Sequence, residues 1–321
     1  MAEQRGLDVR VLRGGNSSER EVSLKSGKNV IEALASRDNG YNPIDGEFSN
    51  PDEILNLIAG VDLVFNCLHG GIGENGTVQT LLETLDVPYT GTGPYGSALA
   101  MDKIRSKQTF ERADIKTPDF YLIEEDPKGF DPAIISEEFG YPTLLKPVHE
   151  GSSRGIRVID TEEELAESFC DVQARFGKVF VEQFISGKDI TAGVLRYEGE
   201  LLALPLVELH VKNEPFFNYN AKYGHDETEF IVPARLNDQI TEEVKNLAVK
   251  AHRAHTCSGY SRVDFRVDRS GEAFALEVNT LPGMTDKSDL PFAARYAGIS
   301  FAELVETMIE NSLETNDTPG E

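Results

Sequence analysis

The chain of 321 residues has no tryptophan and only three cysteines, Cys67, Cys170 and Cys257. Their odd number, their wide spacing and the absence of a C-x-x-C pair exclude a disulfide framework. A chain of this length buries enough surface to form a core without such links. We therefore expect reduced thiols and a cytoplasmic protein.

Long hydrophobic runs are also missing. The longest, LLALPLV at residues 201–207, contains Pro205 and is far shorter than the roughly 20 residues of a membrane-spanning helix. The first residues, MAEQRGLD, contain no apolar stretch like that of a signal peptide. We therefore expect neither a signal peptide nor a membrane span.

Positive charge is scarce. Thirty-one Lys and Arg stand against 55 Asp and Glu, which gives a net charge of −24. Nucleic acids and anionic membranes need a basic surface on their protein partners. The charge therefore argues against either as the main partner.

Short apolar runs alternate with helical patterns in the first hundred residues, which predicts an α/β unit with a parallel sheet. We divide the chain into units at 1–96, 97–185 and 186–312, with a frayed tail at 313–321. In the first unit, Ser17 or Ser18 is expected to cap a helix. In the second, one helix is expected over residues 98–113, and in the third a strand over 201–207.

The most informative segment is RVDFRVDRSGEAFALEVN at residues 262–279. A two-residue turn at Ser270-Gly271 would make it a hairpin. In that register Asp264 faces Glu277, and Arg262 faces Asn279. Because side chains alternate along a strand, these four share one face. The same register adds Arg266 and Ala275 to this face, and it places a core on the other face from Val263, Phe265, Val267, Phe274, Leu276 and Val278.

Two carboxylates and an amide on one sheet face suit Mg²⁺ beside substrate phosphates. The alternative is a solvated face with cross-strand ion pairs, and a slip of one residue would destroy the constellation. Gly283, in the following TLPGM, is either a turn residue or an amide donor to an oxyanion.

The segment Gly151-Ser-Ser-Arg-Gly155 matches the G-x-S-x-G pattern of serine hydrolases. That site needs a strand, a sharp turn and a helix, whereas a strand is predicted to follow here. The favoured interpretation is a loop whose backbone N–H groups cradle phosphate, with Lys146 adding a charge. The alternative is an ordinary hairpin loop.

Other patterns are weaker. His252-x-x-His255 lies near a predicted helix C-terminus without a suitable carboxylate, so two histidines favoured by the helix dipole are expected rather than a zinc site. Neither a Walker A motif nor G-x-G-x-x-G is present.

Taken together, seven ordered motifs resemble the D-alanine–D-alanine ligase family of the ATP-grasp superfamily over residues 7–312. They are GGNSSEREVS (14–23), LHGGIGENGT (68–77), MDK (101–103), KP…EGSS (146–153), AKY (221–223), RVD (262–264) and EVNTLPGMT (277–285). The resemblance implies an α/β (α+β) ATP-grasp fold. Residues 1–96 would form an N-terminal Rossmann-like domain, and the second and third units would form the two ATP-grasp subdomains.

The resemblance also implies site residues. ATP would be bound by Lys103, Lys146, Ser152, Ser153, Glu182, Gln183, Ile185, Asp189 and Lys222. Two Mg²⁺ ions, or Mn²⁺ in their place, would be held by Asp264, Glu277 and Asn279. The D-alanine substrates would be bound by Glu19, His69, Arg262 and Ser288. Ser152 and Tyr223 would close the site with Glu19, while Arg262 and the Gly283 amide would stabilise the oxyanion. Lys222 and Tyr223 would lie in a lid over residues 213–230.

The implied reaction is phosphorylation of the first D-alanine by ATP, followed by attack of the second D-alanine amine on the acyl phosphate. The resemblance further implies a homodimer and a role in peptidoglycan biosynthesis. Tyr223 favours the dipeptide product. The alternatives are a relative that uses D-serine, D-lactate or another second substrate, and an ATP-binding homologue without catalysis.

Three positions depart from the family pattern. Asp189 replaces a usual Glu, which shortens the reach to the ribose by one methylene. Arg154 replaces a small apolar residue in the glycine-rich loop. Asp289 stands near the second subsite, where a hydrophobic or basic residue is commoner.

Overall fold

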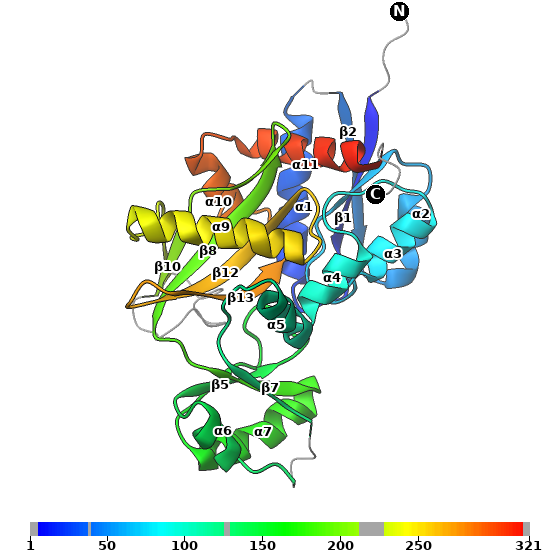
Figure 1. The fold of residues 1–321 in the computed structure, drawn as a ribbon. Helices are drawn as coiled ribbons and strands as arrows, with labels where there is room; N and C mark the ends of the chain where they lie inside the picture. Colours follow the sequence, from blue (N-terminus) through cyan, green and yellow to red (C-terminus); the bar gives the residue numbers. More distant parts are fainter. Residues whose placement is uncertain (1–5, 38–39, 125–128, 212–227, 317–321) are drawn as a thin grey trace, which may run out of the picture.

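The structure is a computed structural model that describes residues 6–37, 40–124, 129–211 and 228–316. Within these ranges the strands form three sheets covered by helices (Figure 1). The expected mixture of helices and sheets is therefore confirmed. No helix in the described ranges is both long and apolar enough to span a bilayer.

The N-terminal sheet is parallel, as predicted. Strand β1 (Leu7–Gly14) lies between β2 (Tyr41–Phe48) and β3 (Leu63–Asn66). Alternate residues point to opposite faces. Val9 and Val11 therefore pack with helix α1 (Arg20–Ala35), while Leu12 packs with α2 (Ile54–Ile58) and α3 (Thr77–Thr84). Short 3-10 turns lie at η1 (Pro51–Glu53) and η2 (Gly71–Gly73).

A small antiparallel sheet occupies the lower part of Figure 1. Its strand order is β4 (Phe120–Ile123), β7 (Val179–Gln183), β5 (Thr143–Pro147) and β6 (Arg157–Ile159). Helices α6 (Ala133–Glu138) and α7 (Glu162–Phe176) cover one face, where Phe169 and Val181 belong to a separate core. This body therefore has its own hydrophobic interior.

The large sheet carries the predicted hairpin. Its strands are β8 (Gly187–Tyr197), β9 (Glu200–Ala203), β10 (Val207–Val211), β11 (Thr228–Ile231), β12 (Tyr260–Asp268) and β13 (Ala273–Asn279). Helix α9 (Asp238–Ala254) covers one face (Figure 1). Helices α10 (Asp289–Tyr296) and α11 (Phe301–Asn316) cover the other, and their core is continuous with that of α1. The N-terminal sheet and the large sheet thus form one packed body.

Three predicted elements differ in the structure. The helix expected over 98–113 is two helices, α4 (Pro94–Met101) and α5 (Lys103–Arg112), because Asp102 Oδ1 accepts the N–H groups of Ile104 and Arg105, both at 3.0 Å, and caps α5. The strand expected over 201–207 is divided between β9 and β10. Neither Ser17 nor Ser18 caps α1, whose N-cap is Glu19; the Ser17 hydroxyl donates instead to the carbonyl of His69 at 2.5 Å.

The hairpin differs from prediction in two places. Its loop has three residues, 269–271, because the Asp268 N–H donates to the carbonyl of Glu272 at 2.9 Å. This shifts the pairing by one residue, so that Phe265 faces Ala275. A bulge at Leu276 then shifts it back, so that Asp264 faces Glu277 as predicted. Ala273 and Ala275 consequently join the core, while Leu276 lines a pocket; the expected places of Phe274, Ala275 and Leu276 were wrong.

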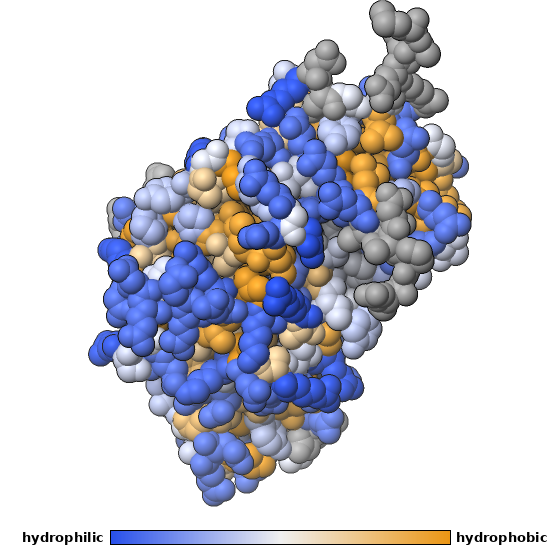
Figure 2. Space-filling view, turned by 45° about the horizontal axis from the view of Figure 1, so that its top comes forward, coloured by the Kyte–Doolittle hydropathy of each residue, from blue (hydrophilic) through white to orange (hydrophobic). Residues whose placement is uncertain are grey.

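The three cysteines are free thiols, of which Cys67 is buried and Cys170 exposed. Figure 2 shows a face on which hydrophilic residues predominate and hydrophobic residues form smaller patches.

Candidate active site

A pocket lies between the small sheet and the large sheet. Nine of the predicted ATP and metal residues line it: Lys103, Lys146, Ser153, Glu182, Gln183, Ile185, Asp189, Asp264 and Glu277. Apolar walls come from Leu144, Ile156 and Phe180 on one side and from Leu209 and Leu276 on the other. Apolar walls with a few convergent polar groups are typical of ligand sites. The lining suits a ligand with an apolar part and a charged part.

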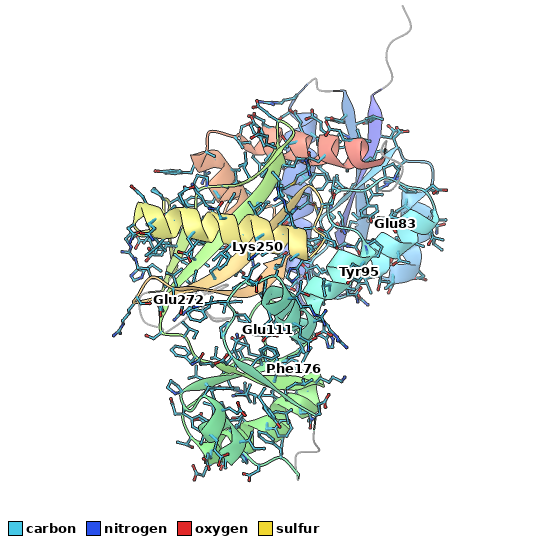
Figure 3. All side chains as sticks on the ribbon, viewed as in Figure 1. Glu83, Tyr95, Glu111, Phe176, Lys250 and Glu272 are labelled. Atoms are coloured by element: carbon cyan, nitrogen blue, oxygen red, sulfur yellow. The ribbon has the colours of Figure 1, made fainter. Side chains whose placement is uncertain are left out.

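The glycine-rich loop forms one edge of this pocket. Ser152 and Ser153 have positive φ angles of 51° and 56°, which is uncommon for residues with a side chain. A Cβ on Gly155 would lie 2.7 Å from Cε2 of Phe176, whose position on the small body is labelled in Figure 3. Strand β6 follows the loop. The segment therefore lacks the strand–turn–helix arrangement of a hydrolase nucleophile.

A buried charge cluster supports the same edge. The Glu182 carboxylate is paired with Lys146 and with Lys107, whose Nζ lies 2.7 Å from Oε2. Lys107 also donates to Thr117 Oγ1 at 2.8 Å and to the carbonyl of Pro118 at 3.0 Å. Burial raises the pKa of Glu182, but the two lysines outweigh it, so that the pKa lies below its ordinary value. The carboxylate is therefore ionised and fixed in place.

On the opposite wall, β8, β12 and β13 align polar residues in cross-strand rows. Thr191, Asp264 and Glu277 form one row, while Arg262 and Asn279 form the next. Thr191 Oγ1 donates to Asp264 Oδ1 at 2.6 Å. The predicted convergence of Asp264, Glu277, Arg262 and Asn279 on one face is confirmed.

Arg262 is 7% exposed and is held from two sides. Its Nε and Nη2 donate to the two oxygens of Asp264 at 2.9 and 2.8 Å, and its Nη1 lies 3.5 Å from Asp289 Oδ2. Burial lowers the pKa of Arg262, but the neighbouring carboxylates outweigh this and raise it. The guanidinium is therefore a fixed positive charge beside the pocket.

The same face suits a hard cation. Asp264 and Glu277 offer carboxylate oxygens, and the Asn279 side-chain oxygen, which accepts the Leu281 N–H at 2.9 Å, offers a third. Among the described residues no group of three or more His, Cys, Asp or Glu forms a metal cage. Mg²⁺ commonly binds through one or two carboxylates and completes its shell with phosphates and water. This donor set therefore fits Mg²⁺ that arrives with a nucleotide.

A second group of predicted residues lies next to the pocket. Ser152 donates to Glu19 Oε1, so the glycine-rich loop meets the start of α1. A Cβ on Gly70 would lie only 2.8 Å from Glu19 Oε2. Glu19 is thus enclosed by two glycine-containing loops, one of which also lines the pocket.

His69 and the segment after β13 are joined through Ser26. The Ser26 hydroxyl lies 3.2 Å from His69 Nε2 and accepts the Met284 N–H at 3.1 Å. Gly283 packs against Ser288, since a Cβ on Gly283 would lie 2.6 Å from Ser288 Oγ. These contacts join Gly283 and Ser288 to His69. Lys222 and Tyr223, with most of the expected lid, lie outside the described residues.

Comparison with known proteins agrees with this geometry. The family model described as "D-ala D-ala ligase C-terminus" matches residues 109–310, and "D-ala D-ala ligase N-terminus" matches residues 43–92. A D-alanine–D-alanine ligase from Halalkalibacterium halodurans is 43% identical over 310 residues, which are 96% of this chain and 100% of the relative. The chain belongs to the D-alanine–D-alanine ligase family.

Solved structures show the same fold. The ligase of this family from Bacillus anthracis, solved with ATP, has a TM-score of 0.83 and 32% identity, and the likeness covers 97% of this chain and 98% of that one. VanG D-Ala:D-Ser ligase from Enterococcus faecalis has a TM-score of 0.83 and 28% identity, with 96% and 99% covered. The ATP-grasp fold expected from the motifs is therefore confirmed.

Three residues of this family member were missed as parts of the site. Lys107 lies four residues after Lys103 on the same helix, and this i, i+4 spacing could have suggested it. Thr191 is the cross-strand neighbour of Asp264. This relation could be recognised only once the pairing of β8 with β12 was known. Arg266 was placed on the correct strand face, but its contact with Asp189 at 2.5 Å was not foreseen.

His252, in the last turn of α9, and His255, its C-cap residue, are buried rather than solvated. His255 Nε2 lies 2.8 Å from Ser106 Oγ, and His252 Nδ1 lies 2.8 Å from Ser261 Oγ. Burial lowers the pKa of both from 6.5 to about 4. Both are therefore neutral, and the interpretation as histidines favoured by the helix dipole was wrong because burial outweighs the dipole.

This burial predicts acid sensitivity. The unfolded chain binds protons at these histidines near pH 6.5, whereas the folded protein does so only near pH 4. The free energy of unfolding should therefore fall as the pH falls through this window, by about 2 kcal/mol per histidine between pH 8 and pH 5. Urea unfolding at several pH values measures it. Replacing both by Asn should flatten the slope; an unchanged slope in the double variant would contradict the prediction.

Proposed function

We propose that this protein ligates two D-alanines to D-alanyl-D-alanine, with ATP converted to ADP and phosphate through a D-alanyl phosphate. The observation that carries the proposal is the paired row on β12 and β13. Asp264 faces Glu277, and the fixed guanidinium of Arg262 holds Asp264 at 2.8 and 2.9 Å. A phosphate-binding face and a buried cation for carbonyl chemistry thus lie side by side.

The first step needs the carboxylate of D-alanine beside the γ-phosphate of ATP. Lys103 and Lys146 line the pocket and would neutralise the phosphates, while the loop at 151–155 would cover them. Lys103 also lies 3.6 Å from Glu277, which directs it toward the proposed metal face. We infer that Asp264, Glu277 and Asn279 hold Mg²⁺, which supplies charge neutralisation of the transferring phosphoryl group.

The second step needs a stabilised oxyanion. Attack of the second D-alanine amine on the acyl phosphate places negative charge on the former carboxylate oxygen. We assign its stabilisation to Arg262 and the Gly283 N–H, since preorganised donors act strongly where water is excluded. Glu19, His69 and Ser152 would hold the first D-alanine, and Ser288 would contact the carboxylate of the second.

The test is phosphate release from ATP with D-alanine, D-serine, D-lactate and L-alanine, alone and in pairs, with identification of the products. D-Alanine alone should give the dipeptide, and EDTA should stop the reaction until Mg²⁺ is restored. No turnover with any pair of D-amino acids would overturn the proposal. ATP binding without turnover would instead favour a homologue without catalysis.

The alternative of D-serine as the second substrate is not favoured. Relatives at about 40% identity are D-alanine–D-alanine ligases, whereas the likeness to VanG is at 28% identity. The assay separates the two, because the preferred candidate requires D-alanine to outcompete D-serine as second substrate. We further propose that the protein is a cytoplasmic homodimer in peptidoglycan biosynthesis.

A further inference from the structure

A buried arginine that the proposed chemistry does not use lies in the pocket wall. Arg266 is 5% exposed and is the cross-strand neighbour of Asp189. Its Nη1 lies 2.5 Å from Asp189 Oδ2, and its Nε donates to the carbonyl of Ile185 at 2.8 Å. The Phe184 ring centre lies 5.7 Å from the guanidinium carbon. These contacts fix the side chain.

The position of the Arg266–Asp189 pair along the pocket indicates which part of a bound nucleotide it contacts. Asp189 comes two residues before Thr191 on β8, which places it about 7 Å along the strand from the row of Asp264. On its other side, Arg266 links it to Ile185 in the connection between β7 and β8. The pocket continues from Asp264 past Asp189 to residues 183–185, which also line it. If the phosphates of ATP lie near Asp264, as the proposed function requires, and the nucleoside extends toward residues 183–185, its sugar passes over Asp189.

A carboxylate in this place faces an electrostatic problem. Without a partner it would repel the nearby triphosphate, whereas pairing with Arg266 offsets its charge. A carboxylate offers about four lone-pair positions, so it can be held by an arginine and still accept a hydrogen bond from a sugar hydroxyl. Aspartate is also short, and the position of its oxygens therefore depends on what holds it.

We propose that Arg266 is a positioning residue that orients Asp189 toward the ribose hydroxyls of ATP, and that the pair selects ribonucleotides over deoxyribonucleotides. Arg266 acts through Asp189 and the backbone of Ile185, not on the reacting atoms. The inference rests on the proposed function only in placing ATP in the pocket.

Titration calorimetry with ATP, 2′-deoxy-ATP and 3′-deoxy-ATP tests the proposal. The unmodified protein should bind ATP at least about tenfold more tightly than one of the deoxynucleotides, as expected for loss of a hydrogen bond to a charged group. Arg266→Met should weaken ATP binding about tenfold and reduce the preference to below about threefold. The KM for D-alanine should stay within about twofold, because the substrate residues lie elsewhere.

Two further variants sharpen the test. Asp189→Glu in the Arg266→Met background adds a methylene and should restore a preference of about fivefold, since the longer carboxylate needs less support. Arg157→Met is the matched control. It removes an arginine that pairs with Asp171 at 3.0 Å and is half exposed, and it should change neither affinity nor preference.

If Arg266→Met weakens the binding of all three nucleotides equally, Arg266 only supports the wall of the pocket, and the proposal is overturned. A wild-type protein that does not distinguish them would overturn it as well. If Arg266→Met does not fold, Arg266→Lys serves instead: a lower preference supports the proposal, and an unchanged one overturns it. Because calorimetry needs no D-alanine, a failure of ligation would overturn the proposed function without deciding this inference.

Discussion

Replacing Arg262 with alanine is expected to lower kcat for dipeptide formation by about 10³, the upper range for loss of an oxyanion donor. The Kd for ATP should change by less than about tenfold, because Arg262 is not itself among the residues that line the pocket and touches it through Asp264. Steady-state kinetics with D-alanine and titration with a non-hydrolysable ATP analogue measure the two quantities. A large fall in kcat with little change in Kd would separate oxyanion stabilisation from nucleotide binding.

Two comparisons make this result specific. Arg262→Lys keeps the charge but cannot make the two-point contact with Asp264, and it should recover only part of the rate. Arg157→Ala, on the surface of the small body, should leave kcat unchanged. Ligation by Arg262→Ala at a rate within tenfold of wild type would show that the oxyanion assignment is wrong.

Replacing Lys107 with methionine is expected to lower the free energy of unfolding by about 3 kcal/mol. Lys107 and Glu182 are 1% and 2% exposed, and removal of one partner of a buried ion pair commonly costs about 3–5 kcal/mol. The lower end applies because Glu182 keeps its contact with Lys146. Urea unfolding at pH 7 measures the loss.

The exposed pair of α9 provides the control. Lys245 lies 2.9 Å from Glu242, and Lys245→Met should change stability by less than about 1 kcal/mol. The double variant Lys107→Met/Glu182→Met should regain part of the loss, since it leaves no buried carboxylate. A loss below about 1 kcal/mol for Lys107→Met would contradict the assigned burial of the pair.

The sequence allowed the face that carries Asp264 and Glu277 to be predicted because a hairpin has few possible registers. The predicted two-residue turn was one residue too short, and the bulge at Leu276 was not foreseen. These two errors cancel at Asp264 and Glu277, where the pairing is correct, but not at Ala275 and Phe274. A bulge depends on how the strand packs against its neighbours, and the alternation of residues carries no sign of it.

Other features depended on contacts between distant residues. Asp102 is a good N-cap residue, yet residues 98–113 also fit one continuous helix, and the structure divides them there. The order of the motifs was enough to predict that Glu19, Ser152 and His69 belong to the site. The role of Ser26 could not be predicted in this way, because Ser26 joins His69 to Met284, which lies 258 positions away from it in the sequence. Such contacts are visible only once the sheets are assembled.

The three-residue connection between β7 and β8 has a consequence for the lifetime of the protein. It joins two bodies with separate cores, and the nucleotide pocket lies between them. Bound ATP therefore holds the two bodies together. It stabilises the folded chain by about 2.7 kcal/mol when the concentration of free ATP is a hundred times its Kd. Without it, that share of the stability is lost, and the small body should open more often and expose its backbone to proteases. The buried Lys107–Glu182 pair and the core shared by Ile104 and Phe180 still hold it to α5. The supply of ATP would then affect how long the protein survives as well as how fast it works.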